Sequence, residues 1–313
     1  MLKAEKHKAS TLVSEHDLEE EEQRLSSIVQ DYFHLMKPGI VTLLVFEAIT
    51  AMIVATGRSV SVIALGLLAL VGILASGGAS ALNQYLEWER DIKMSRTDWR
   101  PVANKRITPR RAFVFGSALT ASGVGISYFT FNPITAMMIL LGALSYVFLY
   151  TVYLKPRTHW NIVVGGIAGV FPALAGWAAA TGVIGWPGLF IGLIVFLWTP
   201  PHFWGLSMKY KEDYERTGFP MLPVVKTETQ VVKWIVFSSI PLFILTLVPL
   251  VLPFLGTYDL IYYFGAAAMA VAFLAIDVKM WRKPTKSNAF LAFLVSLPYL
   301  FVLFSVMIAS SVI

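Results

Sequence analysis

Residues 61–91 read SVIALGLLALVGILASGGASALNQYLEWERD, an apolar run that ends in polar side chains. Its main part, residues 61–87, is long enough to cross a bilayer, since a spanning helix needs about 20 predominantly apolar residues. Asn83, Glu87 and Asp91 recur every four residues at its end. The stretch therefore predicts a membrane-spanning helix whose last turns carry one amide and two carboxylates.

The composition of the whole chain agrees with residence in a membrane. Of the 313 residues, 57% are apolar and 14% are charged, and the mean hydropathy is +0.67. A soluble domain normally holds about 25% charged residues, so burial in lipid is the simplest explanation. The chain contains no cysteine, which excludes disulfides, thiolate nucleophiles and cysteine-held metals. Any metal would have to be held by oxygen or histidine.

Eight further apolar stretches match the first in length. Short uncharged breaks separate some of them, as at Gly57, Asn132-Pro133 and Gly256, and long basic segments separate others. We therefore predict an all-α integral membrane protein with nine transmembrane helices. The expected spans are residues 39–57, 61–87, 112–131, 133–154, 161–181, 186–206, 232–256, 259–280 and 289–312.

The first 31 residues are polar and include the acidic run Glu19–Glu22. They lack the apolar core of a signal peptide, and their acidity argues against a mitochondrial transit peptide. We expect residues 1–30 to form a disordered cytoplasmic tail without a catalytic role, and residues 31–313 to form the membrane domain. The tail fits a bacterial plasma membrane better than a mitochondrial one.

Basic residues mark one side of the predicted bundle. Nearly every Lys and Arg lies in the tail or near residues 88–111, 155–160, 207–231 and 281–288, whereas the opposite turns carry only Arg58. Because basic residues are retained in the cytoplasm, we expect the N-terminus inside and the C-terminus outside. The formal charge of +6 then reflects orientation and anion binding, not a nucleic-acid partner, which would need a basic face on a soluble fold. The active site is expected at the cytoplasmic helix ends.

The four-residue spacing of Asn83, Glu87 and Asp91 places them on one helix face. Hard oxygen ligands of this kind suit Mg²⁺, which keeps several waters and often bridges to substrate phosphates. The alternative is a solvated helix end with intrahelical salt bridges, such as Glu89 with Lys93. Carboxylates at membrane depth are costly unless they are used, which favours the metal site.

A second polar segment follows the sixth expected span. Lys209 and Asp213 are four residues apart, and this pair mirrors the position of the first cluster at a helix end. Two facing carboxylate-bearing helix ends could hold metal ions around a diphosphate, although a single Lys–Asp pair is more often structural. His202, in the same segment, could ligate heme iron or only hydrogen-bond a neighbouring helix.

Several basic residues follow the first cluster or lie on the neighbouring cytoplasmic turn. Some of them must serve only to orient the chain in the membrane. Together with the carboxylates, they describe a site for a metal ion and a diphosphate. They are Arg96, Arg100, Lys105, Arg106, Lys155 and Arg157.

These motifs resemble those of the UbiA superfamily of intramembrane prenyltransferases. The family's first aspartate-rich motif corresponds to Asn83, Glu87 and Asp91, and its second to the stretch ending at Asp213-Tyr214. Within the superfamily, the chain is most similar to the subgroup that uses heme as the prenyl acceptor. That likeness rests on ordered blocks between residues 32 and 225: Lys37-Pro38, Tyr150 to Thr158, Asn161 to Gly166, His202-Phe203-Trp204 and Pro220 to Val224.

Two positions depart from the family pattern. Glu87 and Glu89 stand where the family often has aspartates, but a glutamate can still ligate Mg²⁺ through its longer arm. Gly39 stands where an arginine often follows Lys-Pro, which weakens any assignment of a phosphate contact at that position.

The resemblance implies a nine-helix UbiA-type bundle that uses Mg²⁺ to transfer farnesyl from farnesyl diphosphate to a vinyl group of heme B. Addition of water would give heme O, and a heme A synthase is a further candidate partner. The implied metal-holding and catalytic residues are Asn83, Glu87, Asp91 and Asp213. The implied substrate-binding residues are Arg96, Arg100, Lys155, Arg157, Lys209 and His202.

Three alternatives stay open at this point. The nearest is a UbiA-type enzyme that prenylates an aromatic quinone precursor, such as 4-hydroxybenzoate or a naphthoate. A secondary transporter also has many helices and intramembrane charges, but it places its site near the midplane of the bilayer. A structural subunit of an oxidase assembly complex is the third alternative, and the metal-diphosphate motifs argue against it.

Overall fold

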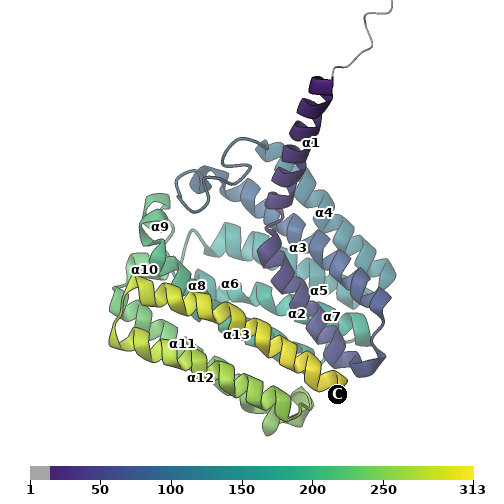
Figure 1. Cartoon of the computed structure of the whole chain (residues 1–313), viewed down its shortest axis with the longest axis vertical. Helices are drawn as coiled ribbons and strands as arrows, with labels where there is room; N and C mark the ends of the chain where they lie inside the picture. The colour runs from purple at the N-terminus through teal and green to yellow at the C-terminus, as the bar shows by residue number, and fades with distance from the viewer. Residues whose placement is uncertain (1–14) are drawn as a thin grey trace, which may run out of the picture.

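The computed structural model describes residues 15–313, which are almost entirely helical (Figure 1). Residues 1–14 of the expected tail lie outside the described residues. The α-helices are α1 (Glu15–Leu35), α2 (Pro38–Thr56), α3 (Val62–Asp91), α4 (Pro109–Thr130), α5 (Pro133–Leu144), α6 (Asn161–Gly165), α7 (Phe171–Thr181), α8 (Trp186–Lys209), α9 (Lys211–Thr217), α10 (Leu222–Val225), α11 (Glu228–Leu247), α12 (Leu260–Arg282) and α13 (Lys286–Val312). A π-helix, η2 (Ser145–Leu154), and the 3₁₀ turns η1 (Gly57–Ser59), η3 (Gly166–Val170), η4 (Val248–Leu250) and η5 (Pro253–Leu255) complete the set.

Within residues 15–313, nine helical segments are long and apolar enough to cross a membrane, as predicted. α5 and η2 together form one of these spans, and α6, η3 and α7 form another. Three spans begin earlier than hydropathy indicates because threonines cap them. The hydroxyls of Thr108 and Thr285 each accept a first-turn backbone N–H, and Thr227 forms a capping box with Gln230.

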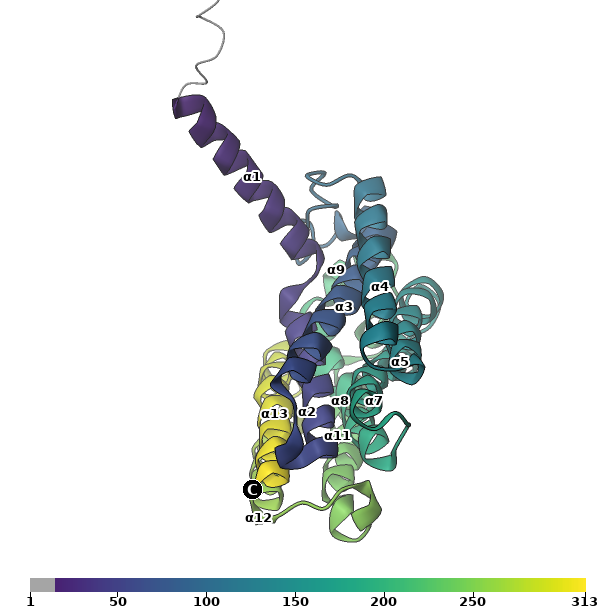
Figure 2. The same ribbon diagram turned by 90° about the vertical axis from the view of Figure 1, so that its right-hand side faces the viewer.

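The structure corrects the expectation of a disordered tail for residues 15–30, which belong to α1. This segment is rich in Glu, Gln and Leu, which are strong helix formers. Its C-terminal end is also anchored, since Asp31 pairs with Arg106 at 2.8 Å and the Leu35 side chain is fully buried. Figure 2 shows α1 leaving the bundle at an angle, as an extension of the membrane domain.

Small residues allow α3 and α4 to pack closely. A Cβ atom on Gly78 would lie 2.6 Å from the Gly116 carbonyl oxygen, and one on Gly123 would lie 2.8 Å from the Ala75 nitrogen. Real Cβ atoms essentially never come this close, so only glycine fits at these crossings. The small-residue stretch Ala75–Ser80 therefore forms a tight contact between α3 and α4.

Two helices join the two halves of the bundle. α2 contacts α3 and α7 on one side and α13 on the other, while α8 contacts α7, α11 and α13. Figure 1 shows α11, α12 and α13 running side by side, with α3, α4 and α5 in the other half. The largest buried cluster surrounds α8 and α11–α13, and the half made by α2–α7 holds the buried polar residues of α3 described below.

The charged connections gather at one end of the bundle. The irregular segment 92–108, between α3 and α4, lies beside the end of α1 (Figure 2). The chain's C-terminus lies at the opposite end, where Arg58 donates a 2.7 Å hydrogen bond to the Val312 carbonyl. Arg58 and the polar cluster of α3 are therefore at opposite ends, as the charge pattern predicts.

Candidate active site

α3 continues through the whole first motif, so its three polar side chains share one buried face. Asn83, Glu87 and Asp91 are 2%, 4% and 3% exposed, whereas Glu89 is exposed on another face of the helix. A solvated helix end would leave all of these carboxylates in water. The motif instead turns two carboxylates and an amide into the protein interior.

Each of these oxygen-bearing groups meets a basic side chain from elsewhere in the chain. Lys155 Nζ donates to both oxygens of Glu87, at 2.6 and 2.7 Å. Arg100 Nη1 donates to both oxygens of Asp91, at 2.9 and 2.8 Å. Because buried charges are costly unless paired, this alternation of acids and bases stabilises a highly charged interior.

Asn83 occupies the inner end of the motif. Its Oδ1 accepts a hydrogen bond from Lys37 Nζ, and its Nδ2 donates to Thr151 Oγ1 at 3.0 Å. Lys37 Nζ also donates to the hydroxyl of Tyr146 at 3.2 Å. Burial lowers the pKa of Lys37 well below its usual value, and the Arg100 charge lowers it further. An anion bound nearby would therefore stabilise the protonated form of Lys37.

The π-helix η2 supplies the wall opposite α3. Its wider turns bring Tyr146 and Tyr150 together, with their rings stacked at 6.0 Å, and lead directly into Lys155. π-helical turns are rare and frequently mark functional sites. Burial of the ammonium lowers the pKa of Lys155, while the Glu87 carboxylate opposes that shift.

Asp213 joins the site through the irregular segment 92–108. It is 4% exposed and accepts a hydrogen bond from Ser95 Oγ at 2.7 Å and one from the Arg96 backbone N–H at 3.4 Å. Arg216 forms an ion pair with the same carboxylate. Arg96 Nη2 also donates to the Tyr214 hydroxyl at 3.4 Å. The segment that follows the first motif is thus tied directly to the second motif.

Lys209 and Asp213 do not share one helix end, although they are four residues apart. α8 ends at Lys209 and α9 begins at Lys211, so Tyr210 breaks the helix between the two residues. Lys209 is exposed, with its ammonium 3.6 Å from the centroid of the Phe290 ring. The second motif therefore resembles the end of α3 in its buried carboxylate, Asp213, but Lys209 is not part of this resemblance.

The structure divides the predicted basic residues into two groups. Arg100 and Lys155 pair with the buried carboxylates, and Arg96 lies between the Asp213 and Tyr214 contacts. Arg157 is exposed and donates to the Val152 and Tyr153 carbonyls, at 2.7 and 2.9 Å, so the structure does not bring it to the carboxylates. Lys105 is exposed, and Arg106 pairs with Asp31.

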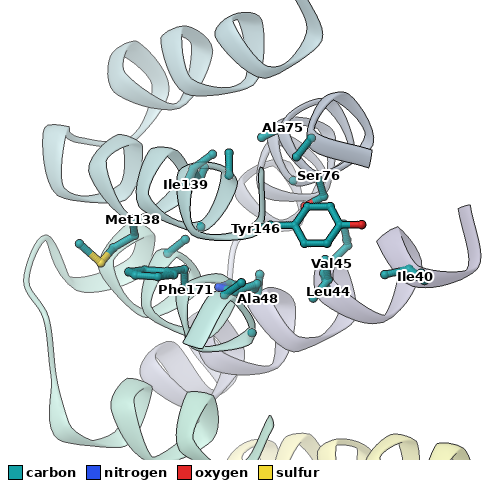
Figure 3. Close-up of a pocket in the computed structure, with 18 of the residues that line it drawn as sticks. Ile40, Leu44, Val45, Ala48, Ala75, Ser76, Met138, Ile139, Tyr146 and Phe171 are labelled. Atoms are coloured by element: carbon teal, nitrogen blue, oxygen red, sulfur yellow. The ribbon is translucent and has the colours of Figure 1, made fainter. Parts of the chain in front are cut away.

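An apolar cavity of about 200 Å³ lies between α2, α3, α5 and α7 (Figure 3). Small residues of α2, α3, α5 and α7 form much of its wall, including Ala48, Ala75 and Ala175. Tyr146 belongs to both regions, because its ring lines the cavity and its hydroxyl contacts Lys37. The arrangement places a charged head group site next to a narrow space for a hydrocarbon.

Comparison with known proteins identifies the family of this chain. The model of the UbiA prenyltransferase family matches residues 44–305. The chain belongs to the UbiA prenyltransferase family.

Curated relatives cover almost the whole length of this UbiA chain. A protein named protoheme IX farnesyltransferase from Sulfurisphaera tokodaii is 37% identical over 284 residues, which cover 88% of this chain and 91% of the relative. A protein of the same name from Symbiobacterium thermophilum is 40% identical over 285 residues, covering 90% and 93% of the two chains.

Solved structures share the UbiA fold. A structure of digeranylgeranylglyceryl phosphate synthase aligns with a TM-score of 0.74 at 16% identity, covering 91% of this chain and 98% of that one. A UbiA homolog from Archaeoglobus fulgidus, bound to GPP and Mg²⁺, aligns with a TM-score of 0.64 at 15% identity, covering 88% and 99%. At such low identity these similarities show the fold alone, a nine-span bundle of the UbiA type.

The donor chemistry of this UbiA site suits Mg²⁺. Its buried carboxylate and amide oxygens are hard ligands, the kind this ion prefers. Within residues 15–313, no three acidic or histidine side chains gather closely enough to enclose a metal by themselves. This is compatible with Mg²⁺, which usually takes one or two carboxylates and fills its remaining positions with water and phosphate.

His202 lies away from the carboxylates in the described contacts, between α8 and α13. Its Nδ1 is 2.6 Å from the Ser296 hydroxyl, and its ring stacks on Trp198 at 3.9 Å and contacts Phe293 at 4.6 Å. These contacts hold the imidazole in a fixed orientation. They agree with a helix-packing role and also with a ligand whose ring is held in place by hydrogen bonding.

The acidic and basic motifs alone do not predict several residues of the site. Lys37, Tyr146, Tyr150 and Ser95 all contact the cluster, but none of them belongs to an acidic or basic repeat. Lys37 offers one signal, since it is a lysine placed directly before the proline that opens the first span. Tyr150 offers another, since it begins the block Tyr150 to Thr158 on which the resemblance rests, whereas Tyr146 offers none.

Proposed function

We propose that this chain transfers the farnesyl group of farnesyl diphosphate to a vinyl group of heme B, with addition of water, to give heme O. The names of its full-length relatives specify a farnesyl group and protoheme IX. The observation that carries the proposal is the contact between the apolar cavity and the acid–base cluster at Tyr146. Such a site accommodates a hydrocarbon chain that ends in a charged head.

In this proposal, Asn83, Glu87, Asp91 and Asp213 hold Mg²⁺, as suggested by the UbiA homolog bound to GPP and Mg²⁺. The metal, when bound, neutralises charge on the diphosphate oxygens. Lys37, Arg96, Arg100 and Lys155 bind the same oxygens through charge-assisted hydrogen bonds. In the structure Lys37, Arg100 and Lys155 contact residues of the first motif. Arg96 contacts Asp213 and Tyr214 of the second motif, so all four residues already lie at the site that a diphosphate would share.

The reaction follows from stabilising the leaving group. Cleavage of the allylic C–O bond sends its electron pair to the diphosphate, whose charge the four cations stabilise. The π electrons of the heme vinyl group then form the new C–C bond to the farnesyl cation. Water adds to the resulting benzylic-type cation and loses a proton, which leaves a hydroxyethylfarnesyl side chain. The apolar cavity wall keeps water from the farnesyl cation before the vinyl group attacks.

The proposed heme contact is His202. Hydrogen bonding of Nδ1 to Ser296 would leave Nε2 as the ring nitrogen for iron, in the manner of other metal-bound histidines. Trp198 and Phe293, which flank the imidazole, offer apolar surface to a porphyrin. A heme A synthase would be the natural recipient of the product.

We also propose that the chain resides in the plasma membrane, with the site facing the cytoplasm. The support is the positive-inside rule applied to its loops, since the basic connections lie at the end opposite Arg58. Farnesyl diphosphate is charged and comes from the aqueous cytoplasm. A site that opens to the cytoplasm therefore lets it enter without crossing the bilayer.

The test is direct product analysis. Detergent-purified protein is incubated with heme B, farnesyl diphosphate and Mg²⁺, with an EDTA control, and the porphyrins are analysed by mass spectrometry. We expect a Mg²⁺-dependent species heavier than heme B by a hydrated farnesyl group. Asp91→Asn should lower the rate by about 100-fold or more, because it removes a charged ligand of the site. Asp98→Asn, on an exposed residue of the neighbouring segment, should leave the rate unchanged.

Either of two results would contradict the proposal. If heme B returned unchanged while 4-hydroxybenzoate or a naphthoate became prenylated, the proposed acceptor would be wrong. The proposed prenyl transfer would stand. If EDTA or Asp91→Asn left the rate intact, the metal-diphosphate site would be wrong.

A further inference from the structure

The apolar cavity has a polar end and a closed end. In Figure 3, Ile40 and the hydroxyl of Tyr146 lie toward one end, and Met138 and Phe171 lie at the other. Helix directions agree with this view, because Met138 precedes Tyr146 by eight residues on the same span. A chain that entered beside Tyr146 would therefore run toward Met138.

α3 forms a regular wall along the same direction. Ser80, Ser76, Gly72 and Leu68 all line the cavity, at a constant spacing of four residues. Each interval spans about 6 Å of helix, and the three intervals together span about 18 Å. The side chains are small at the first three positions, and Leu68 is the first large one. An extended isoprene unit is slightly shorter than one such interval, so three units fit between Ser80 and Leu68.

Packed core closes the far end of the cavity. Leu68 is 2% exposed and belongs to a buried cluster with Met52 and Val71. Met138 is 3% exposed and belongs to a second cluster, which includes Ala175. Ile139 packs against both clusters and so connects them at this end of the cavity.

We infer that Leu68 and Met138 form a floor that limits the prenyl chain to three isoprene units. This inference rests on the proposed function, in that it assumes the cavity takes the prenyl chain. It adds which residues decide the length of that chain. Truncating either residue to alanine removes three heavy atoms, and truncating both removes six. One further isoprene unit has five carbons, so the double truncation makes room for a fourth unit.

The experiment compares chain lengths in competition on the full-length protein. Wild type and the double variant Leu68→Ala/Met138→Ala receive equal amounts of geranyl, farnesyl and geranylgeranyl diphosphate together with heme B. The products are quantified by mass spectrometry. A pocket discriminates roughly 10- to 200-fold for each methylene that fails to fit. We expect the ratio of geranylgeranyl to farnesyl product to rise at least tenfold in the double variant.

A matched control lies on the same two helices. Leu70 and Met137 are 45% and 46% exposed, and neither lines the cavity. The variant Leu70→Ala/Met137→Ala removes the same atoms from the outer surface and should leave the product ratio unchanged. A ratio measured within one sample also does not depend on how much of the variant folds.

A variant that fills the cavity tests the inference if the truncated variants fail to fold. Ala175 lines the cavity in the same cluster as Met138, and Ala175→Leu adds three heavy atoms there. This variant should lower farnesyl use relative to geranyl use by about tenfold.

Different results would contradict the proposed function and the inference about chain length. If wild type used no prenyl diphosphate with any acceptor, the proposed function would fall. If wild type transferred farnesyl but the floor variants and Ala175→Leu kept the wild-type product ratios, the inference about Leu68 and Met138 would fall alone. An equal shift in the Leu70→Ala/Met137→Ala control would also overturn it, since the effect would then be general to the helices.

Discussion

The backbone of Lys37 shows how single residues build this site. Its φ of 53° and ψ of 62° lie in the left-handed region, which is uncommon for a residue with a side chain. The residue before a proline also tends to be extended. The conformation places the lysine at the start of α2, where its ammonium bonds Asn83 and Tyr146. Local strain of about 1–3 kcal/mol is therefore retained at a position that contacts the proposed diphosphate site.

The lowered pKa of Lys37 leads to a prediction for pH dependence. Only the protonated lysine binds an anion well, and burial makes it lose its proton at a lower pH than an ordinary lysine. The value of kcat/KM for farnesyl diphosphate should therefore fall as pH rises through this lowered pKa. Lys37→Arg stays charged and should move that fall to higher pH. Lys37→Met should lower kcat/KM by about 10- to 100-fold at neutral pH.

The control for this prediction is Lys105→Arg. Lys105 also has a positive φ, of 60°, but its side chain is exposed and should not affect the pH profile. If wild type and Lys37→Arg lost activity at the same pH, the group that titrates would be another one, and Lys37 would have no role in binding the diphosphate.

Among the elements, η2 has the greatest effect on the site. Its π-helical turns bring Thr151 to Asn83 and Tyr146 to Lys37, and deliver Lys155 to Glu87. An α-helix of the same sequence would turn by about 100° for each residue, and its last residues would face elsewhere. Residues 145–154 contain no glycine or proline to mark the π-helical turns, and this form accompanies the contacts of Thr151 and Lys155 with α3.

Deleting one residue of η2 tests its role. Phe148 is 59% exposed, so its side chain contributes little to the core. With the π-helical turns kept, its deletion moves Lys155 back by one position and turns its side chain away from Glu87. We expect kcat/KM to fall at least 100-fold and thermal unfolding to occur at a lower temperature, since an unpaired buried carboxylate costs about 3–5 kcal/mol.

The matched control is Phe148→Ala, which removes the side chain and keeps the residue. It should behave like wild type in both the rate and the unfolding temperature. Full activity of the deletion variant would show that the π-helical form is not required for the position of Lys155.

In the whole molecule, the charged end depends on the two halves being held together, because Asp213 of α9 bonds Ser95 and Arg96 of segment 92–108. α2 and α8 make that connection, and the basic loops all lie at the end away from Arg58. The same asymmetry that orients the chain in the bilayer therefore also concentrates cations around the buried carboxylates. One set of charges has two consequences.

The proposed orientation can be tested with single cysteines, because the natural chain has none. Asn104 lies exposed in segment 92–108, and Ser59 lies exposed in η1 at the opposite end. A membrane-impermeant maleimide should label Ser59→Cys on intact cells and Asn104→Cys only in inverted vesicles. The reverse pattern would place the site outside the cell and contradict the proposed topology.

The order of spans and the first motif follow from the sequence itself. Hydropathy gives the nine spans, because backbone groups in lipid must be satisfied within each helix, which makes every long apolar run a helix. The spacing of Asn83, Glu87 and Asp91 gives their common face for the same local reason. Hydropathy does not give the exact helix starts, since a threonine cap such as Thr108 adds polar turns to the apolar run.

The tertiary structure alone decided which cations belong to the site. Lys155 is 68 residues from Glu87, and Lys37 is 46 residues from Asn83, so no local pattern connects them. Arg157, only two residues after Lys155, turns to backbone carbonyls on the surface. A side chain's partner depends on which helices pack together, and the small residues that let those helices meet also leave the cavity. Sequence periodicity sets the face of one helix, whereas ion pairs and cavities are properties of several helices at once.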